Sequence, residues 1–190
     1  MKAVFIVFSP SGHTLIAARK FMSLLEDNGI SCHMINITKN DKYLQDFTIT
    51  KTLVNDLGEH HLLIPCAPVY AGHCEQNILR TIRALPREKE KQIPAIPLVT
   101  YGGVHSSVAL EEMGKALNDK GYIPIMGIKI AAEHTLTATF KKRINPNLPG
   151  EVEDQILAEA AEIIEKVVND KIAMVNVGKK FAYAPFMKRI

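Results

Sequence analysis

The sequence predicts an α/β fold in which a five-stranded parallel sheet carries helices on both faces, as a doubly wound three-layer sandwich. Short apolar runs typical of buried strands alternate along the chain with longer segments of helical apolar spacing. Five such strand–helix pairs follow one another, and parallel strands need helical crossovers of this kind. With 190 residues, 47% of them apolar, the chain suits one domain with a full core.

The elements follow one another in a regular order. The expected strands cover residues 3–8, 32–37, 62–70, 96–100 and 123–131. The expected helices cover residues 15–26, 41–57, 78–85, 108–119 and 151–169. Pro65 and Pro68 fall in the third strand, where proline removes a donor from the hydrogen-bond ladder. We therefore expect that strand to be irregular or shortened.

Charge and cysteine usage exclude several classes of function. The net charge is only +3, and the run from Lys141 to Arg143 is the one basic cluster, so we expect no nucleic-acid partner. Three cysteines without a C-x-x-C spacing argue against a disulfide framework and against a thiolate metal site.

No apolar stretch reaches the roughly 18 residues that a membrane span needs, and the N-terminus lacks a signal-peptide pattern. We expect a cytoplasmic protein with a domain over 1–170 and a C-terminal extension over 171–190.

The loop between the first strand and the first helix reads Ser9-Pro10-Ser11-Gly12-His13-Thr14. It lacks the lysine of a Walker P-loop and the three glycines of the dinucleotide fingerprint. It offers hydroxyl groups and the unpaired amides of a helix N-terminus, which suit a terminal phosphate monoester. The same residue types also cap helices and make turns, so this loop taken alone leaves both interpretations open.

Two further loops follow the third and fourth strands, and both carry glycine and tyrosine. Because ligands of such sheets bind at the carboxyl ends of the strands, all three loops should converge there. Small residues let the backbone approach a flat ligand, and a tyrosine can stack on it. The predicted site residues are Ser9, Ser11, Gly12, His13, Thr14, Pro68, Val69, Tyr70, Ala71, Gly72, Thr100, Tyr101, Gly102 and Gly103.

These loops resemble those of the flavodoxin family over roughly residues 1–170. In that family a Ser/Thr-x-Thr/Ser-Gly-Asn-Thr loop holds the phosphate of flavin mononucleotide (FMN), and His13 stands here where asparagine is usual. The resemblance implies that the stretches 68–72 and 100–103 flank the isoalloxazine ring of FMN. It also implies the strand order 2-1-3-4-5 with FMN where the order reverses, an arrangement that flavodoxin itself exemplifies.

A closer resemblance is to the flavodoxin half of flavodoxin–ferredoxin hybrid proteins. It rests on the stretches Val99-Thr100-Tyr101-Gly102, Lys120-Gly121-Tyr122 and Ala132-Glu133-His134. Members of that subgroup continue into a ferredoxin segment with repeated C-x-x-C spacings. This sequence has no cysteine after Cys74, so the resemblance does not extend to a built-in electron partner.

Three functions follow from these observations. The first is an FMN protein that carries electrons to a redox partner protein, with a ferredoxin as one candidate. The second is an FMN-dependent NAD(P)H oxidoreductase, in which a homodimer completes the site and the basic run 141–143 meets a nicotinamide nucleotide. The third is a flavin-free interaction module with the flavodoxin-like fold, for which the departure at His13 is one argument.

Other chemical signals are weak. Cys74 and Arg80 have the C-x5-R spacing of a phosphatase loop, but the five residues between them include no glycine and favour a helix. The histidines show no metal-ligand spacing, so no metal site is predicted. His134 follows the fifth strand near the predicted site, where it is either a proton donor or a loop residue bonded to the backbone. No catalytic residue is assigned from the sequence.

Overall fold

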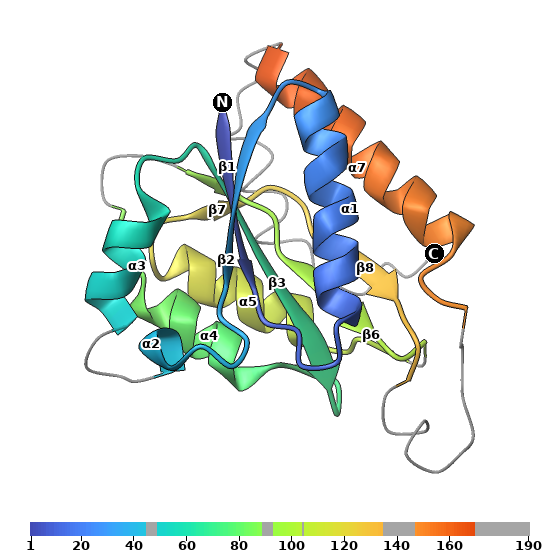
Figure 1. The fold of residues 1–190 in the computed structure, drawn as a ribbon, viewed down its shortest axis with the longest axis horizontal. Coiled ribbons are helices and arrows are strands. Elements are labelled where there is room, and N and C mark those ends of the chain that lie inside the picture. Colours follow the sequence, from blue (N-terminus) through green and yellow to red (C-terminus); the bar gives the residue numbers. More distant parts are fainter. Residues whose placement is uncertain (45–48, 89–92, 104, 135–146, 170–190) are drawn as a thin grey trace.

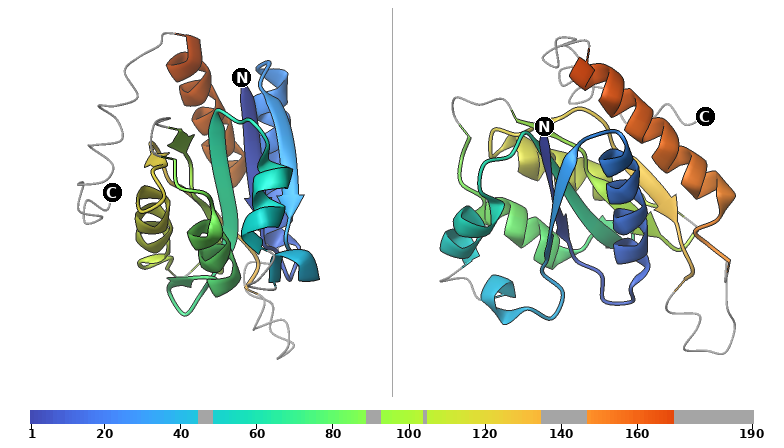
Figure 2. Two further views of the ribbon diagram at one scale, coloured as in Figure 1. Left: turned by 90° about the vertical axis from the view of Figure 1, so that its left-hand side faces the viewer. Right: turned by 45° about the horizontal axis from the view of Figure 1, so that its top comes forward.

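The computed structural model describes residues 1–44, 49–88, 93–103, 105–134 and 147–169. Its centre is a mostly parallel sheet, and helices lie on both faces, as the views in Figures 1 and 2 show. The predicted extension 171–190 and the basic run 141–143 lie outside the described residues. Among the helices of the described part, none combines the length and the apolar character that crossing a membrane would require.

The parallel sheet has five strand positions in the predicted order 2-1-3-4-5. The first three positions are held by β2 (Ser31–Asn36), β1 (Lys2–Val7) and β3 (Leu62–Tyr70). The fourth position is divided between β5 (Pro94–Ala95) and β6 (Leu98–Tyr101). The fifth is divided between β7 (Ile123–Pro124) and β8 (Ile128–Ala131). An additional strand, β4 (His73–Cys74), pairs antiparallel with β3 and was not predicted.

The third strand is neither irregular nor shortened, which corrects the expectation based on its prolines. The carbonyl oxygen of Leu63 accepts a hydrogen bond from the fourth strand position, and that of Cys66 accepts one from the chain just after β1. Alternation along the strand therefore turns the nitrogen of Pro65 toward the gap between β5 and β6, where the register places Pro97. The nitrogen of Pro68 faces the other side, beyond the end of β1. Both prolines therefore lie where the ladder is interrupted or has ended, and β3 still runs from Leu62 to Tyr70.

The helices divide between the two faces of the sheet. α1 (His13–Asp27) and α7 (Glu151–Asn169) lie side by side on one face. The opposite face carries α2 (Asp41–Leu44), α3 (Ile49–Leu57), α4 (Gln76–Ala84) and α5 (Ala109–Asn118). The predicted helix over 41–57 corresponds to α2 and α3, and residues 45–48 between them lie outside the described part.

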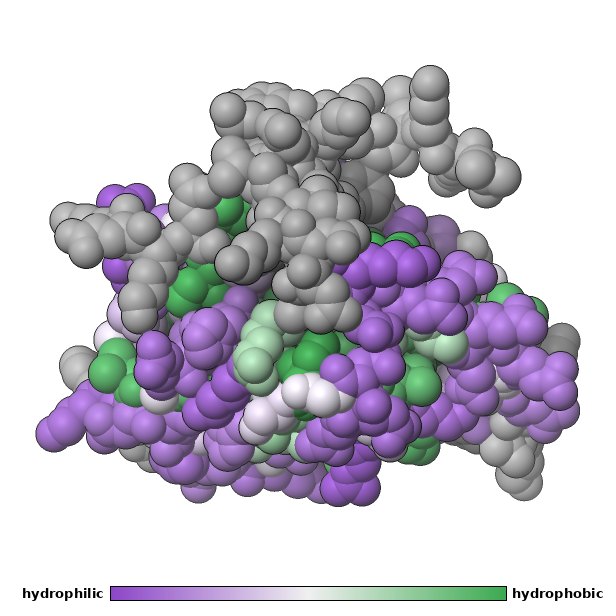
Figure 3. All heavy atoms as spheres, turned by 90° about the horizontal axis from the view of Figure 1, so that it is seen from above, coloured by the Kyte–Doolittle hydropathy of each residue, from purple (hydrophilic) through white to green (hydrophobic). Residues whose placement is uncertain are grey.

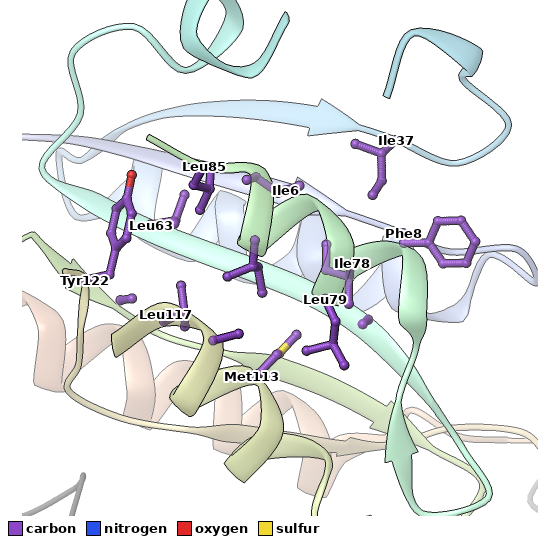
Figure 4. Packing of buried hydrophobic residues seen from close by; sticks show 14 of the residues in the cluster. Ile6, Phe8, Ile37, Leu63, Ile78, Leu79, Leu85, Met113, Leu117 and Tyr122 are labelled. Carbon is purple, nitrogen blue, oxygen red and sulfur yellow. The ribbon is translucent and has the colours of Figure 1, made fainter. Parts of the chain in front are cut away.

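Each face of the sheet has its own hydrophobic core. On the α1 and α7 face, the rings of Phe5 and Phe21 meet edge to face with centroids 6.1 Å apart. On the other face, Ile6 and Leu63 meet side chains from α4 and α5, among them Ile78 and Leu117 (Figure 4). Successive residues of β1 thus serve opposite cores, which explains why its sequence is apolar without alternation.

The two ends of the sheet are bordered by different loops. The loops that follow β1, β3 and β6 lie at the lower end in Figure 1, where the strand order reverses between β1 and β3. Figure 3 views the opposite end, where the described residues are mostly hydrophilic with small hydrophobic areas between them. A ligand site is therefore expected at the lower end, at the topological switch point.

Candidate functional site

A cavity of about 330 Å³ lies at the carboxyl ends of the parallel strands. This volume is at the lower end of the range for small-molecule sites, about 300–1,000 Å³. Four segments far apart in the sequence contribute to its wall, after β1, β3, β6 and β8. Its lining residues are Ser11, His13, Pro68, Val69, Tyr70, Ala71, Thr100, Tyr101, Gly102, Glu133 and His134. The predicted convergence of the three loops is thus confirmed.

The first loop presents unpaired backbone donors. α1 begins at His13, and the hydroxyl oxygen of Ser9 accepts a hydrogen bond from the Leu15 amide at 2.9 Å. Within the described part of the chain, the amides of Ser11, His13 and Thr14 donate to no acceptor. Amides at the start of a helix carry partial positive charge, so this loop offers three donors to an anion beside the cavity.

Two hydroxyls of the predicted phosphate loop make internal contacts instead. The Thr14 side chain is buried, and its hydroxyl lies 2.7 Å from that of Thr100 at the end of the neighbouring strand β6. The hydroxyl of the buried Ser9 accepts the hydrogen bond from the Leu15 amide. The backbone amide of Ser9 donates to the Thr38 hydroxyl at 2.8 Å. Both residues fasten the loop to the sheet. Their direct contact with a phosphate stays a prediction.

The second loop is the turn of a β-hairpin. β3 pairs with β4 through Val69 with Cys74 and through Tyr70 with His73. Ala71 and Gly72 form the turn with φ values of 51° and 84°, the positive values typical of tight hairpins. Tyr70 projects at the rim of the cavity and is 47% exposed. Partial burial and the nearby Glu75 raise the pKa of Tyr70, so its hydroxyl stays protonated at neutral pH.

The third loop approaches the chain that follows β8. Thr100, Tyr101 and Gly102 line the cavity. A β-carbon on Gly102 would lie 2.4 Å from Cδ2 of His134, so only glycine lets the two segments meet without displacing the imidazole. This contact brings His134 into the cavity wall together with Glu133.

Nine of the fourteen predicted site residues line the cavity. The others support it or lie beside it, namely Ser9, Gly12, Thr14, Gly72 and Gly103. Sequence reasoning missed Glu133, and it noted His134 only as a residue near the site. The signal for both was present, because the rule that ligands meet the carboxyl ends of parallel strands applies equally to the fifth strand.

The C-x5-R spacing does not form a phosphatase loop. Cys74 belongs to β4, and Arg80 lies within α4, so four of the five residues between them are helical and the fifth, Glu75, is the N-cap. Burial, with the carboxylates of Glu112 and Glu75, raises the pKa of the Cys74 thiol. A buried neutral thiol is not a nucleophile. In the described residues, no three acidic, histidine or cysteine side chains gather as a metal site.

No known family model and no curated protein matches this sequence. Several solved structures share its fold. Rubredoxin oxygen:oxidoreductase from Desulfovibrio gigas superposes with a TM-score of 0.63 at 15% identity, covering 90% of this chain and 37% of that one. This chain therefore spans little more than a third of that protein's length.

Two neighbours match over nearly their whole length. Flavodoxin 1 from Bacillus cereus has a TM-score of 0.59 at 12% identity, covering 88% of this chain and 98% of that one. The azoreductase AzrA has the same TM-score and identity, covering 87% of this chain and 100% of that one. These similarities confirm the predicted flavodoxin-like fold. The ligand has to be argued from the cavity itself.

Proposed function

We propose that the chain binds FMN in this cavity and carries electrons as a redox protein. The supporting observation is that three amides of the first loop have no acceptor among the described residues, and that two of these residues, Ser11 and His13, line the cavity. Tyr70 and Tyr101 line the same cavity. An anion-binding group and a surface for a planar ring are the two parts that a ribityl flavin phosphate requires. Both lie at the switch point of the sheet, where ligands of such folds bind.

The residues present fit FMN in chemical character. The amides of Ser11, His13 and Thr14 would hold the phosphate, in the manner of anion sites at helix N-termini. Tyr70 and Tyr101 would contact the ring, because aromatic side chains favour offset or edge contacts with flat π systems. The absence of a side chain at Gly102 leaves room for the His134 ring, which lines the cavity beside it.

The protein contributes binding, orientation and electrostatics, while FMN would supply the electron-transfer chemistry. The exposed Tyr70 lies at the rim of the cavity, so a partner docked there would approach the ligand across a short distance. A redox partner protein, with a ferredoxin as one candidate, is therefore part of the proposal.

The alternative is an FMN-dependent NAD(P)H oxidoreductase. Glu133 and His134 favour it, because ionisable side chains in the cavity wall can hold or release a proton beside the bound ligand. Anaerobic mixing with NADH or NADPH separates the two functions. Rapid bleaching of the flavin absorbance supports the oxidoreductase, and slow bleaching supports the electron carrier.

Titration of the ligand-free protein tests the proposal. FMN should bind one per chain and shift its visible absorption bands, and riboflavin should bind at least about tenfold more weakly because it lacks the phosphate. Equal binding of FMN and riboflavin would contradict the role of the first loop. If neither ligand binds, the flavin-free interaction module is the remaining function.

Substitution of the cavity rim separates specific binding from adsorption. Tyr70→Ala should weaken FMN binding by about tenfold through loss of aromatic contact. The matched control is Ile163→Ala on α7, because Ile163 is 49% exposed, close to the 47% of Tyr70, yet does not line the cavity. Equal losses in the two variants would contradict binding at this site.

A further inference from the structure

We propose that Glu112 is a positioning residue of the cofactor site, whose carboxylate holds the β3–β4 hairpin where Tyr70 and Ala71 line the cavity. This proposal rests on the proposed function, because the ligand that benefits is FMN. Glu112 itself does not line the cavity, so it would act only through the hairpin.

The contact joins α5 to the second strand of the hairpin. Glu112 lies in the first turn of α5, and its Oε1 lies 2.7 Å from Nδ1 of His73. Its Oε2 accepts a hydrogen bond from the Cys74 amide at 2.8 Å. One carboxylate therefore bonds two consecutive residues of β4. Hydrogen bonds to an ionised acceptor are roughly twice as strong as neutral ones.

A second contact holds the turn of the same hairpin. The carbonyl oxygen of Gly72 accepts a hydrogen bond from the Val108 amide at 3.2 Å. A β-carbon on Gly72 would lie 2.8 Å from Cβ of Ser107, so the turn packs tightly on the chain that leads into α5. The hairpin is thus attached at its turn and at its second strand, both times to the start of one helix.

The hairpin needs such support because it is short. β4 has only two residues, and two antiparallel strands without further packing are marginally stable in water. Tyr70 and His73, the pair next to the turn, are both exposed. Without the Glu112 carboxylate, the Cys74 amide would lose its acceptor, and the hairpin would lose its hydrogen bonds to the side chain of Glu112. Tyr70 would then be held less firmly at the cavity.

The first experiment compares FMN affinity among variants of α5. Glu112→Ala should weaken FMN binding by about tenfold, which corresponds to about 1.4 kcal/mol. The FMN affinity of Glu112→Gln should lie between those of the wild type and Glu112→Ala, because glutamine keeps one oxygen acceptor for the Cys74 amide. The matched control is Glu111→Ala, which removes an exposed carboxylate from the same helical turn and should bind FMN like the wild type.

A double-mutant cycle distinguishes positioning from general stabilisation. If Glu112 acts by placing Tyr70, Glu112→Ala should cost little further FMN affinity in a Tyr70→Ala background. Losses that multiply in the double variant would show that Glu112 affects binding by another route, and they would overturn the proposal.

Hydrogen exchange of the ligand-free protein supplies a readout independent of FMN. Exchange at the Cys74 amide should accelerate about tenfold in Glu112→Ala and stay unchanged in Glu111→Ala. If Glu112→Ala leaves exchange at Cys74 unchanged or binds FMN like the wild type, the role of Glu112 is overturned, but the proposed function is not. A wild-type protein that binds no FMN overturns the proposed function, and the role of Glu112 toward FMN falls with it.

Discussion

The first loop and the β3–β4 hairpin border one cavity but are fixed by different kinds of interaction. The first loop is held by neutral, buried contacts, above all the pair of hydroxyls on Thr14 and Thr100. The hairpin is held by the carboxylate of Glu112, whose side chain is 29% exposed, and by the close fit of Gly72 against Ser107 in the chain that leads into α5. The difference predicts that the attachment of the first loop to the sheet is insensitive to salt and pH, whereas the attachment of the hairpin that presents Tyr70 depends on charge and on glycine.

The largest effect is expected at Gly72. Gly72→Ala should lower the free energy of unfolding by about 2–4 kcal/mol, because it combines left-handed backbone strain with a clash against Ser107. Gly12→Ala is the control from the first loop, since its φ of 90° is similar but a β-carbon there meets open space. It should cost only about 1–2 kcal/mol. Urea unfolding measures both, and equal losses would show that the close fit at the hairpin is unimportant.

The second-largest effect is expected at the buried hydroxyl pair of Thr14 and Thr100. Thr100→Val should lower the free energy of unfolding by about 2 kcal/mol, because it leaves the buried Thr14 hydroxyl without a partner. Replacing both threonines by valine should restore most of that loss, since no polar group then stays unsatisfied. Thermal unfolding of the two single variants and the double variant measures the coupling. An additive loss would mean that the hydroxyls do not depend on each other.

The same contrast explains how much of the molecule could be predicted from its sequence. The five strand–helix units were predictable because apolar runs and helical spacing are local signals, and the 151–169 helix has the predicted bounds. The first loop was predictable for the same reason, because its cap from Ser9 to Leu15 spans six residues. The prediction that β3 is irregular was wrong, because whether its prolines fit depends on the neighbouring strands.

The hairpin could not be predicted because its determinants are distant or unusual. Glu112 lies 38 residues from Cys74, and nothing near either residue indicates that they meet. The turn residues are Ala71 and Gly72, whereas asparagine or aspartate before glycine is the usual signal of a tight hairpin. Glu133, by contrast, could have been predicted, because the expected fifth strand ends at residue 131, where β8 ends, and Glu133 follows that end in the cavity wall.

A smaller effect is expected at Ser9. Ser9→Ala should lower the free energy of unfolding by about 1 kcal/mol, because the Leu15 amide in the first turn of α1 loses the side-chain acceptor that caps it, the N-cap residue itself being Gly12. Ser11→Ala is the control within the same loop, because the exposed Ser11 leaves the Leu15 amide bonded to Ser9. It should change stability by less than about 0.5 kcal/mol. A larger effect at Ser11 than at Ser9 would contradict the assignment of the cap.

The smallest effect is expected at His73, the exposed partner of Glu112. The His73 side chain is 59% exposed, so His73→Ala should lower the free energy of unfolding by less than about 1 kcal/mol, which is also the limit for exposed contacts that are ion pairs. The Cys74 amide keeps its bond to Glu112 in this variant, so hairpin exchange should change less than in Glu112→Ala. When His73 is protonated, the ionic part of any loss should disappear in 1 M salt, which screens exposed charges over about 3 Å. A loss of 2 kcal/mol or more that persists in salt would instead place the main attachment of the hairpin at His73, and the division between a neutral first loop and a charge-dependent hairpin would no longer rest on Glu112.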